Sequence, residues 1–294
     1  SGEIVVVPVG LPRAVVDAVG ASARRLTRRS ISEQLPARAS DGHKGTFGHV
    51  GVVGGAPGME GASALAARGA FRTGAGLVTW NMPQGVQRNL EVPEVMTHPV
   101  AEDLDNQSAV LVVGPGLGTD SEGARLLSLA LSSERPLVLD ADALNLVARE
   151  GLSVPLGCVL TPHPGEAARL LGVSTPEIQD DRPGAARRIS ERFEATVVLK
   201  GAGTLVASPG EPTSILSVAC PALAVAGSGD VLAGVIGGFR AQGLTAVAAA
   251  QAGAWVHGQA GVSLSQARAP LGLFASEIAD AIPEIIDDLT GEAL

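Results

Sequence analysis

The chain has 294 residues, among them 38 glycines, while only 2% are aromatic and none is tyrosine. Proteins that bind nucleic acid stack bases on aromatic side chains or attract phosphates with positive charge. This chain carries a net charge of −9, so composition argues against a nucleic-acid partner. Its 46% hydrophobic share can build a substantial core, and we expect a globular protein.

Membrane and secretion signals are weak. The best apolar stretch, residues 222–239, carries Asp230 in its middle, so we predict no membrane span. Cys158 and Cys220 are too few for a disulfide framework, and the N-terminus lacks the order of a signal peptide. We therefore predict a cytoplasmic protein.

The first 40 residues differ from the rest of the chain. Residues 4–9 could form a strand, whereas residues 24–38 are rich in arginine and lack a clear apolar period. We predict that residues 1–40 form an N-terminal extension or linker and that residues 41–294 form one domain.

Short β-branched runs alternate with alanine-rich stretches from about residue 49 onwards. The predicted strands are 49–53, 77–81, 109–113, 137–139, 158–160 and 196–199. The predicted helices between them are 61–73, 121–132, 143–149, 164–171 and 183–193. A hairpin over 205–218 and helices over 230–242, 245–261 and 275–289 complete the prediction. Nearly continuous apolar strands that alternate with helices indicate a three-layer α/β/α fold with a mostly parallel central sheet.

The most specific segment is the glycine-rich stretch 226–230, which ends in Asp230 and runs directly into an apolar helix. Glycines let the backbone approach a ligand, and free N–H groups at a helix start bind anions. Asp230 could take a proton from a substrate hydroxyl that attacks phosphorus, or it could simply cap the helix. Spacing alone does not decide between these two roles.

Further glycine-rich loops follow predicted strands at 54–61, 114–118 and 200–204. No P-loop sequence occurs, so a bound nucleotide must be held by other loops such as these. The third loop begins with Lys200, which with Lys44 is one of two lysines among 21 basic residues. Three such loops together with the 226–230 segment favour a nucleotide-binding site.

Polar residues also follow the strands that end near 139 and 160. Glu166 is expected in a helix first turn, where the dipole favours a carboxylate, or in contact with magnesium through water. His163 could contact substrate, although a lone histidine is more often structural. Asp140 and Asp142 could point to the same cleft, and we favour a helix cap for Asp142.

In order along the chain, these segments resemble the ADP/ATP-dependent NAD(P)H-hydrate dehydratases, a branch of the ribokinase-like superfamily. The matching segments are 44–49, 54–62, 114–118, 139–145, 161–166, 199–204 and 226–234. The resemblance implies a ribokinase-like fold and a lyase that repairs the nicotinamide cofactors. NADH or NADPH hydrate (S epimer) would be dehydrated while ADP or ATP is consumed with Mg²⁺. It also implies a homo-oligomer, with a tetramer favoured.

The resemblance assigns roles to individual residues. Asp230 would activate the substrate hydroxyl, and Glu166 matches a magnesium-associated acidic position. The backbone N–H groups expected to stabilise the transferred phosphoryl group are those of Gly227, Ser228 and Gly229. The residues expected to face the hydrate, besides Asp230, are Ala62, Gly116, Gly118 and His163. Those expected to hold the AMP part of the nucleotide are Lys200, Gly201, Ala202, Gly203, Thr204 and Gly229. Lys44 lies in a matching segment but has no role that we can derive.

Two features keep alternatives open. The N-terminal piece resembles the junction found where this domain follows an epimerase, so the chain could be part of a bifunctional protein. Residues 220–226 depart from the asparagine and Met-Ala-Thr run common in the family. This departure leaves open a nucleotide-binding module without turnover. The other alternative is a ribokinase-like kinase of a vitamin precursor or sugar, which the segments 44–49 and 163–166 match less well than the dehydratases.

Overall fold

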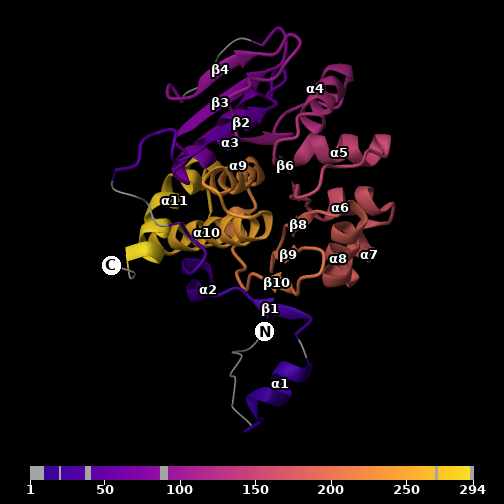
Figure 1. Ribbon diagram of the computed structural model, residues 1–294, viewed down its shortest axis with the longest axis vertical. Coiled ribbons are helices and arrows are strands. Elements are labelled where there is room, and N and C mark those ends of the chain that lie inside the picture. The colour runs from indigo at the N-terminus through magenta and orange to yellow at the C-terminus, as the bar shows by residue number, and fades with distance from the viewer. Residues whose placement is uncertain (1–9, 20, 37–40, 87–91, 269–270, 292–294) are drawn as a thin grey trace.

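The structure of the protein is a computed structural model that describes residues 10–19, 21–36, 41–86, 92–268 and 271–291. Ten strands of the described residues form one sheet in the order β1-β10-β9-β8-β7-β6-β5-β2-β3-β4 (Figure 1). The strands are β1 Ala23–Arg25, β2 His49–Val53, β3 Leu77–Met82, β4 Met96–Pro99, β5 Val110–Val113, β6 Leu137–Leu139, β7 Val159–Leu160, β8 Thr196–Leu199, β9 Leu205–Ala207 and β10 Thr213–Ile215. Only β9 runs antiparallel to its neighbours, β8 and β10, so the sheet is mostly parallel as predicted.

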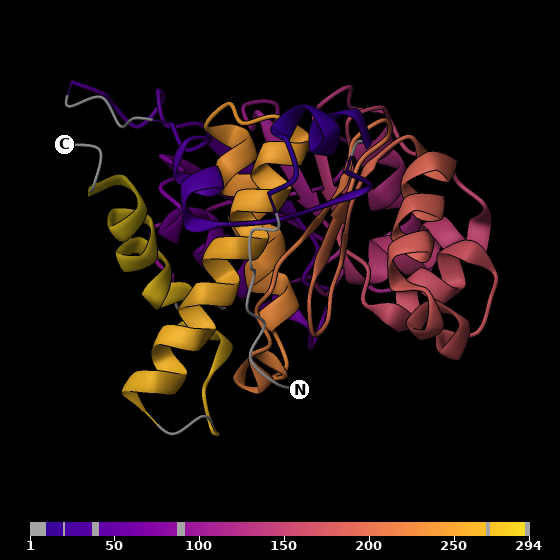
Figure 2. The same cartoon turned by 90° about the horizontal axis from the view of Figure 1, so that it is seen from below.

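Helices cover both faces of this sheet. The helices are α1 Arg13–Val19, α2 Arg28–Ser32, α3 Glu60–Arg72, α4 Ser121–Leu131, α5 Ala141–Glu150, α6 Pro164–Leu171, α7 Thr175–Asp180, α8 Arg182–Phe193, α9 Ser228–Ala241, α10 Ala246–Ala267 and α11 Ala275–Thr290, with a 3₁₀ turn at Pro221–Leu223. Only α1 among the described helices stands away from the sheet (Figure 1). In Figure 2 the orange and yellow helices α9–α11 lie on one side of the strands and α4–α8 on the other. Among the described residues, no helix has both the length and the apolar character that a membrane crossing requires.

Side chains along the buried strands alternate between the two faces of the sheet, so the core has two parts. Val50, Val52 and Val112 pack with the helices α3, α9, α10 and α11. Leu111 and Val113 point to the opposite face, where they pack with α4, α5, α6 and α8. Successive side chains of a strand alternate between faces, so continuous apolar runs fill both cores. The predicted three-layer α/β/α architecture is confirmed, and nearly all of its central elements begin and end within two residues of prediction.

Close packing against α3 fixes the position of α9 in the fold. A Cβ on Gly234 would lie 1.9 Å from the Ala66 carbonyl oxygen, and one on Gly69 would lie 2.5 Å from that of Val231. Both distances are shorter than any real carbon–oxygen contact, so only glycine permits this approach. The backbone contact holds the amino-terminal half of α9 against α3.

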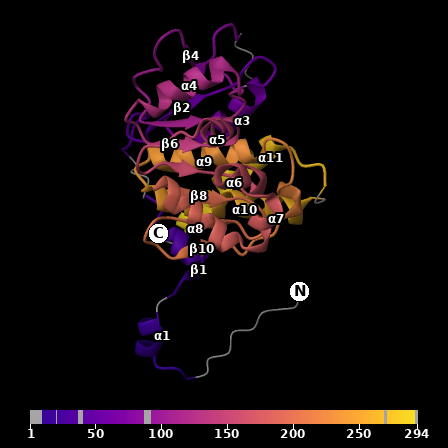
Figure 3. The same cartoon turned by 90° about the vertical axis from the view of Figure 1, so that its right-hand side faces the viewer.

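The N-terminal region differs from the expected linker. β1 pairs in parallel with β10, and Ile31 of α2 is fully buried in the core. Thr27 caps α2, which has only five residues and is too short to show a helical period in its sequence. Figure 3 shows α1 standing away from the sheet. The strand predicted over residues 4–9 lies outside the described residues, and the domain boundary at residue 40 stays a prediction.

Two further elements were not predicted. The edge strand β4 is partly exposed and contains His98 and Pro99, so it lacks the apolar run that reveals a buried strand. The helix α7 has six residues with one fully buried side chain, Ile178, which is too few to show a period.

Candidate active site

Charged side chains gather where three neighbouring strands end. Asp140 follows β6, Lys200 follows β8, and Glu166 lies in the helix that begins after β7. These strands pair side by side in parallel, so their carboxyl ends meet at one edge of the sheet, the edge where open α/β sheets bind ligands. The fold thus joins residues from three separate sequence segments.

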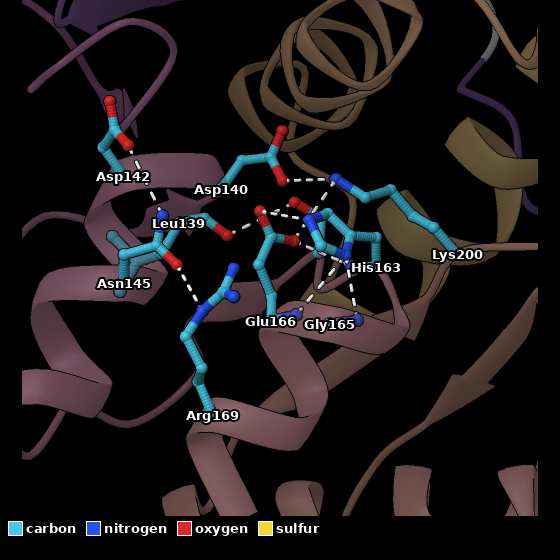
Figure 4. Close-up of polar contacts among 10 residues, drawn as sticks. Leu139, Asp140, Asp142, Asn145, His163, Gly165, Glu166, Arg169 and Lys200 are labelled. Atoms are coloured by element: carbon cyan, nitrogen blue, oxygen red, sulfur yellow. Dashed lines mark hydrogen bonds and ion pairs between the residues drawn. The ribbon is translucent and has the colours of Figure 1, made fainter. Parts of the chain in front are cut away.

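Lys200 is the centre of this group (Figure 4). Its Nζ lies 2.6 Å from Asp140 Oδ1 and 3.9 Å from Glu166 Oε2, and both carboxylates are buried. Burial alone would lower the pKa of Lys200, but the two carboxylates raise it above its ordinary value. The ammonium group is therefore charged, and it is shared by the two acids.

The backbone around Asp140 leaves its carboxylate free for this pairing. Asp140 is the N-cap residue of α5, yet its side chain makes no capping hydrogen bond. The next residue, Ala141, has a φ of +49°, an uncommon conformation for a residue with a side chain. The chain turns sharply here, and the Asp140 side chain points to Lys200 (Figure 4).

His163 and Glu166 close the start of α6. The Glu166 Oε2 accepts a hydrogen bond of 2.7 Å from the His163 N–H, and His163 Nδ1 accepts bonds from the N–H groups of Gly165 and Glu166. This reciprocal cap, with Pro164 in the first turn, confirms that Glu166 lies where the helix dipole favours a carboxylate. His163 also lines the cavity described below, so its contact with substrate stays a prediction.

Burial shifts the pKa values of Glu166 and His163 in opposite directions. Burial raises the pKa of Glu166 to about 7, with Lys200 opposing the rise and Asp140 adding to it. Burial, together with Lys200 and Arg169, lowers the pKa of His163, which is therefore neutral at pH 7. Glu166 Oε2 accepts from the His163 N–H, and Oε1 lies 3.3 Å from His163 Nε2. A carboxylate has about four lone-pair sites, so others remain for water, which fits a water-mediated contact to a cation.

Asp230 lies in the first turn of α9, beside the same cluster. Burial raises the pKa of Asp230 to about 7, and the neighbouring Asp140 carboxylate adds to the rise while Lys200 opposes it. Among the described residues no side chain or backbone group donates a hydrogen bond to this carboxylate. It does not cap α9, because the N-cap position is taken by Gly227, which has a φ of +87° and no side-chain cap. The carboxylate is thus available to a ligand.

The start of α9 supplies free N–H groups. Among the described residues the N–H groups of Gly227 and Gly229 have no partner, whereas that of Ser228 donates to the Val225 carbonyl oxygen at 3.3 Å. A Cβ on Gly229 would lie 3.2 Å from Lys200 Nζ and 3.6 Å from Asp140 Oδ2, so this backbone rests against the ion pair. An anion at the helix start would therefore also lie near a lysine ammonium.

A cavity of about 570 Å³ opens over these groups. Its walls are the loop after β8, the segment 216–225, the start of α9 and one face of α10 around Ala254 and His257. The cavity brings together most of the residues expected to bind the nucleotide: Lys200, Gly201, Ala202, Thr204 and Gly229. The size suits a mononucleotide, within the usual range for small-molecule pockets.

Ala62, Gly116 and Gly118 form a second group that does not line this cavity. A Cβ on Gly116 would lie 3.2 Å from that of Ala62, because the two glycine-rich loops are joined by hydrogen bonds from Gly55 and Ala56. The Asp142 carboxylate accepts a hydrogen bond of 2.9 Å from the Gly118 N–H. Our prediction that Asp142 caps α5 is therefore wrong: Asp140 holds the cap position, and Asp142 fastens the neighbouring loop instead.

Lys44 lies elsewhere. Its backbone carbonyl oxygen faces Gly76 just before β3, at the opposite end of the sheet from Lys200. Its side chain is exposed, so only one of the two lysines joins the charged cluster.

Sequence reasoning missed two residues around the cavity. His257 of α10 is buried, its Nε2 lies 3.1 Å from Ser228 Oγ, and burial lowers its pKa to about 4. Arg182, at the start of α8, donates to carbonyl oxygens of the loop after β8. His257 stands in an alanine-rich helix and Arg182 is one of many arginines, so neither has a motif that could have identified it.

Within the described part of the chain, no group of three or more His, Cys, Asp or Glu side chains could hold a metal ion. Asp140 and Glu166 already share the single positive charge of Lys200. A divalent cation at this site would need most of its ligands from a bound phosphate and from water.

The family model for NAD(P)H-hydrate dehydratase matches residues 50–284, which contain every residue of this cluster. The ADP-dependent (S)-NAD(P)H-hydrate dehydratase of Neisseria meningitidis is 43% identical over 277 residues, covering 89% of this chain and 93% of the relative. The chain belongs to the NAD(P)H-hydrate dehydratase family. The resemblance stated from the sequence motifs is thereby confirmed.

Bifunctional relatives and solved structures extend this result. The bifunctional NAD(P)H-hydrate repair enzyme Nnr of Coxiella burnetii is 42% identical over 284 residues, which cover 94% of this chain but 58% of the relative. The chain thus spans little more than half the length of such relatives. The Bacillus subtilis ADP/ATP-dependent NAD(P)H-hydrate dehydratase, co-crystallized with ATP/Mg²⁺, has a TM-score of 0.80 at 27% identity over 90% of this chain and 97% of that chain. The ribokinase-like fold of this family member is confirmed.

Proposed function

We propose that this chain dehydrates the S epimer of NADH or NADPH hydrate and consumes ADP or ATP in doing so. The observation that carries the proposal is the unpartnered Asp230 carboxylate beside the free N–H groups of Gly227 and Gly229. A base next to an anion site is what phosphoryl transfer to a hydroxyl requires. The names of the relatives support the choice of substrate and nucleotide.

The proposed reaction has two stages. Asp230 takes the proton of the hydroxyl on the hydrated ring as that oxygen attacks the terminal phosphorus of the nucleotide. The bond from this phosphorus to the bridging oxygen breaks, which releases AMP from ADP, or ADP from ATP. The phosphorylated oxygen then leaves as phosphate, and loss of a proton from the adjacent ring carbon restores the double bond. The oxygen of the eliminated water thus ends in the phosphate, while its two hydrogens leave as protons, one through Asp230 and one from the ring carbon to water.

In this scheme, groups of the protein would stabilise the charge of the transferred phosphoryl group and hold the nucleotide and the hydrate in place. The N–H groups of Gly227 and Gly229 would stabilise the phosphoryl oxygens in transfer, while Ser228 would contribute less because its N–H donates to Val225. The loop 200–204 would hold the AMP part within the cavity. Ala62, Gly116 and Gly118, whose loop is fastened by Asp142, would face the hydrate together with His163.

A magnesium ion is part of the proposal. It would be held mainly by the nucleotide phosphates, with Glu166 in contact through water, and would neutralise part of the phosphate charge. The choice of ADP or ATP and the homotetramer stay predictions from the resemblance, and the cytoplasmic location stays a prediction from the sequence.

The test is incubation of the purified protein with NADH hydrate, Mg²⁺ and ADP or ATP, while the absorbance of reduced nicotinamide is followed. We expect recovery of absorbance that depends on the nucleotide, with AMP or ADP and phosphate formed in equal amounts. Phosphorylation of a vitamin precursor or a sugar without hydrate repair would instead support a kinase. Nucleotide binding without any turnover would support a binding module.

A further inference from the structure

The loop 200–204 leaves two of its N–H groups without a partner in the described protein and engages most of its carbonyl oxygens. Among the described residues the N–H groups of Gly201 and Ala202 have no partner, and both residues line the cavity. The Gly201 carbonyl oxygen accepts a hydrogen bond of 3.0 Å from Thr204 Oγ1. Donors are thus left for an anionic ligand, while this acceptor is satisfied within the loop.

Arg182 binds further carbonyl groups in and beside the loop. Its Nη2 donates to the carbonyl oxygens of Leu199, Lys200 and Gly203 at 3.3, 3.4 and 3.5 Å. One guanidinium nitrogen thus holds both ends of the loop. Nη2 carries two hydrogens, so the three acceptors share them, which fits the long distances.

The Arg182 side chain is itself held in place. Its Nη1 donates to Gln179 Oε1 at 3.2 Å, and its backbone begins α8, where the Asp181 carboxylate caps the helix through the Gly184 N–H. The helix α8 packs against β8 and β9, which flank the loop. Arg182 is half-buried and does not line the cavity, so it acts on the loop from behind.

Gly201 shows how closely the guanidinium supports the loop. Its φ is +140°, and a Cβ there would lie 3.0 Å from Arg182 Nη1 and 3.1 Å from Nη2. A side chain at this position would push the guanidinium away from the carbonyl groups. The glycine and the arginine therefore depend on each other.

We propose that Arg182 is a positioning residue that holds the loop 200–204 in the conformation that binds the nucleotide. It binds three carbonyl oxygens and leaves the N–H groups of Gly201 and Ala202, two residues that line the cavity, available to an anionic ligand. The inference rests on the proposed function, in which this loop holds the AMP part. It predicts a role in nucleotide affinity and not in the chemical step.

The test compares Arg182→Gln, Arg182→Lys and the control Arg187→Gln, which removes an exposed charge from the same helix. ADP affinity is measured by calorimetry, KM and kcat by hydrate turnover, and exchange of the loop amides by mass spectrometry without ligand. Since hydrogen bonds from a charged donor are lost, we expect Arg182→Gln to weaken ADP binding roughly tenfold and to raise KM alike. The kcat at saturating ADP should stay close to wild type, and the Gly201 and Ala202 amides should exchange faster.

The conservative variant and the control give the remaining outcomes. Arg182→Lys should recover part of the affinity, and Arg187→Gln should behave as wild type. The inference is overturned if Arg182→Gln binds ADP normally with unchanged amide exchange, if both glutamine variants weaken binding equally, or if kcat falls while ADP affinity does not. Amide exchange tests the positioning role even if wild type fails to bind ADP, a result that would instead remove the proposed function.

Discussion

The two ends of the parallel sheet treat buried polar groups in opposite ways. In the connection that leads to the amino end of β5, the Asp105 carboxylate accepts hydrogen bonds from Ser108 Oγ at 2.6 Å, from the N–H groups of Gln107 and Ser108, and from Asn81 Nδ2 of β3. At the carboxyl end Asp230 has no such donor among the described residues, and Asp140 and Glu166 share one lysine. One end satisfies its acids internally, while the other leaves them incompletely satisfied.

The pKa values follow from this difference. Burial alone would raise the pKa of Asp105, but hydrogen bonds from Ser108, Gln107 and Asn81 lower it below its ordinary value. Burial raises the pKa of Asp230 and Glu166 to about 7 each. A buried carboxylate with a full set of donors stabilises the fold, whereas one without them costs stability and is available for chemistry.

The largest stability effect is expected for Lys200→Met. This change leaves Asp140 and Glu166 buried without their shared cation, and breaking a buried ion pair by removing one partner costs about 3–5 kcal/mol. Urea unfolding at pH 7 measures it, with Lys44→Met as the control because Lys44 is exposed at the other end. Equal stability of the two variants would show that the cluster does not need its lysine.

Asp230→Asn should stabilise the protein above pH 7. The pKa of Asp230 rises from 3.8 to about 7 on folding, so the cost of its ionised form grows as pH rises from about 4 and is complete above about 7. Asparagine carries no charge, and we expect the variant to be more stable by about 2–4 kcal/mol at pH 8. The gain should fade towards pH 4 in thermal unfolding, while the exposed Asp103→Asn shows no such trend. A pH-independent difference would contradict the raised pKa.

Asp105→Asn should destabilise the protein, whereas Asp230→Asn should stabilise it. Its amide would direct hydrogen atoms at donors on Ser108 or Asn81, and losing charge-assisted bonds costs about 2 kcal/mol at pH 7. Because the folded pKa is lowered, this stabilisation is present above the unfolded pKa and is lost as pH falls through the folded value. Denaturant unfolding measures this loss of stability, and turnover per folded molecule tests whether activity is unchanged. A loss of turnover at unchanged stability would reverse the assignment of the two ends.

Asp142→Ala should have the smallest effect of these variants. It frees the Gly118 N–H from its 2.9 Å hydrogen bond and loosens the loop expected to face the hydrate. We expect a roughly fivefold rise in the KM for NADH hydrate with the KM for ADP unchanged, since one hydrogen bond is lost. Steady-state kinetics with each substrate varied in turn measures this, and Glu150→Ala in the same helix is the control. A change confined to the KM for ADP would be inconsistent with this account.

The central fold could be predicted because its signals are local. The strands β2, β6 and β8 and the helix α6 match their predicted bounds, since continuous apolar runs and a proline start are visible in sequence. The elements β1, α2, β4 and α7 could not be predicted. Each is short, and each is stabilised by tertiary contacts that a period search does not detect.

The candidate site also has parts that the sequence could predict and parts that it could not. Asp230, Glu166 and Lys200 were found because each follows a strand or starts a helix in a recognisable segment. Which group each side chain contacts depends on tertiary geometry: Lys200 pairs with Asp140, and Asp142 binds Gly118 and does not cap its helix. For the same reason nothing in the sequence indicated Arg182 or His257.

The most direct test of the account is NADH hydrate turnover by Asp230→Asn, measured with ADP and Mg²⁺ beside ADP affinity by calorimetry. If the unpartnered carboxylate at the carboxyl end of the sheet is the base, turnover should fall by about 10²–10⁴-fold while the affinity for ADP changes little. Turnover near the wild-type rate would contradict the assignment of Asp230 and, with it, the functional distinction between the two ends.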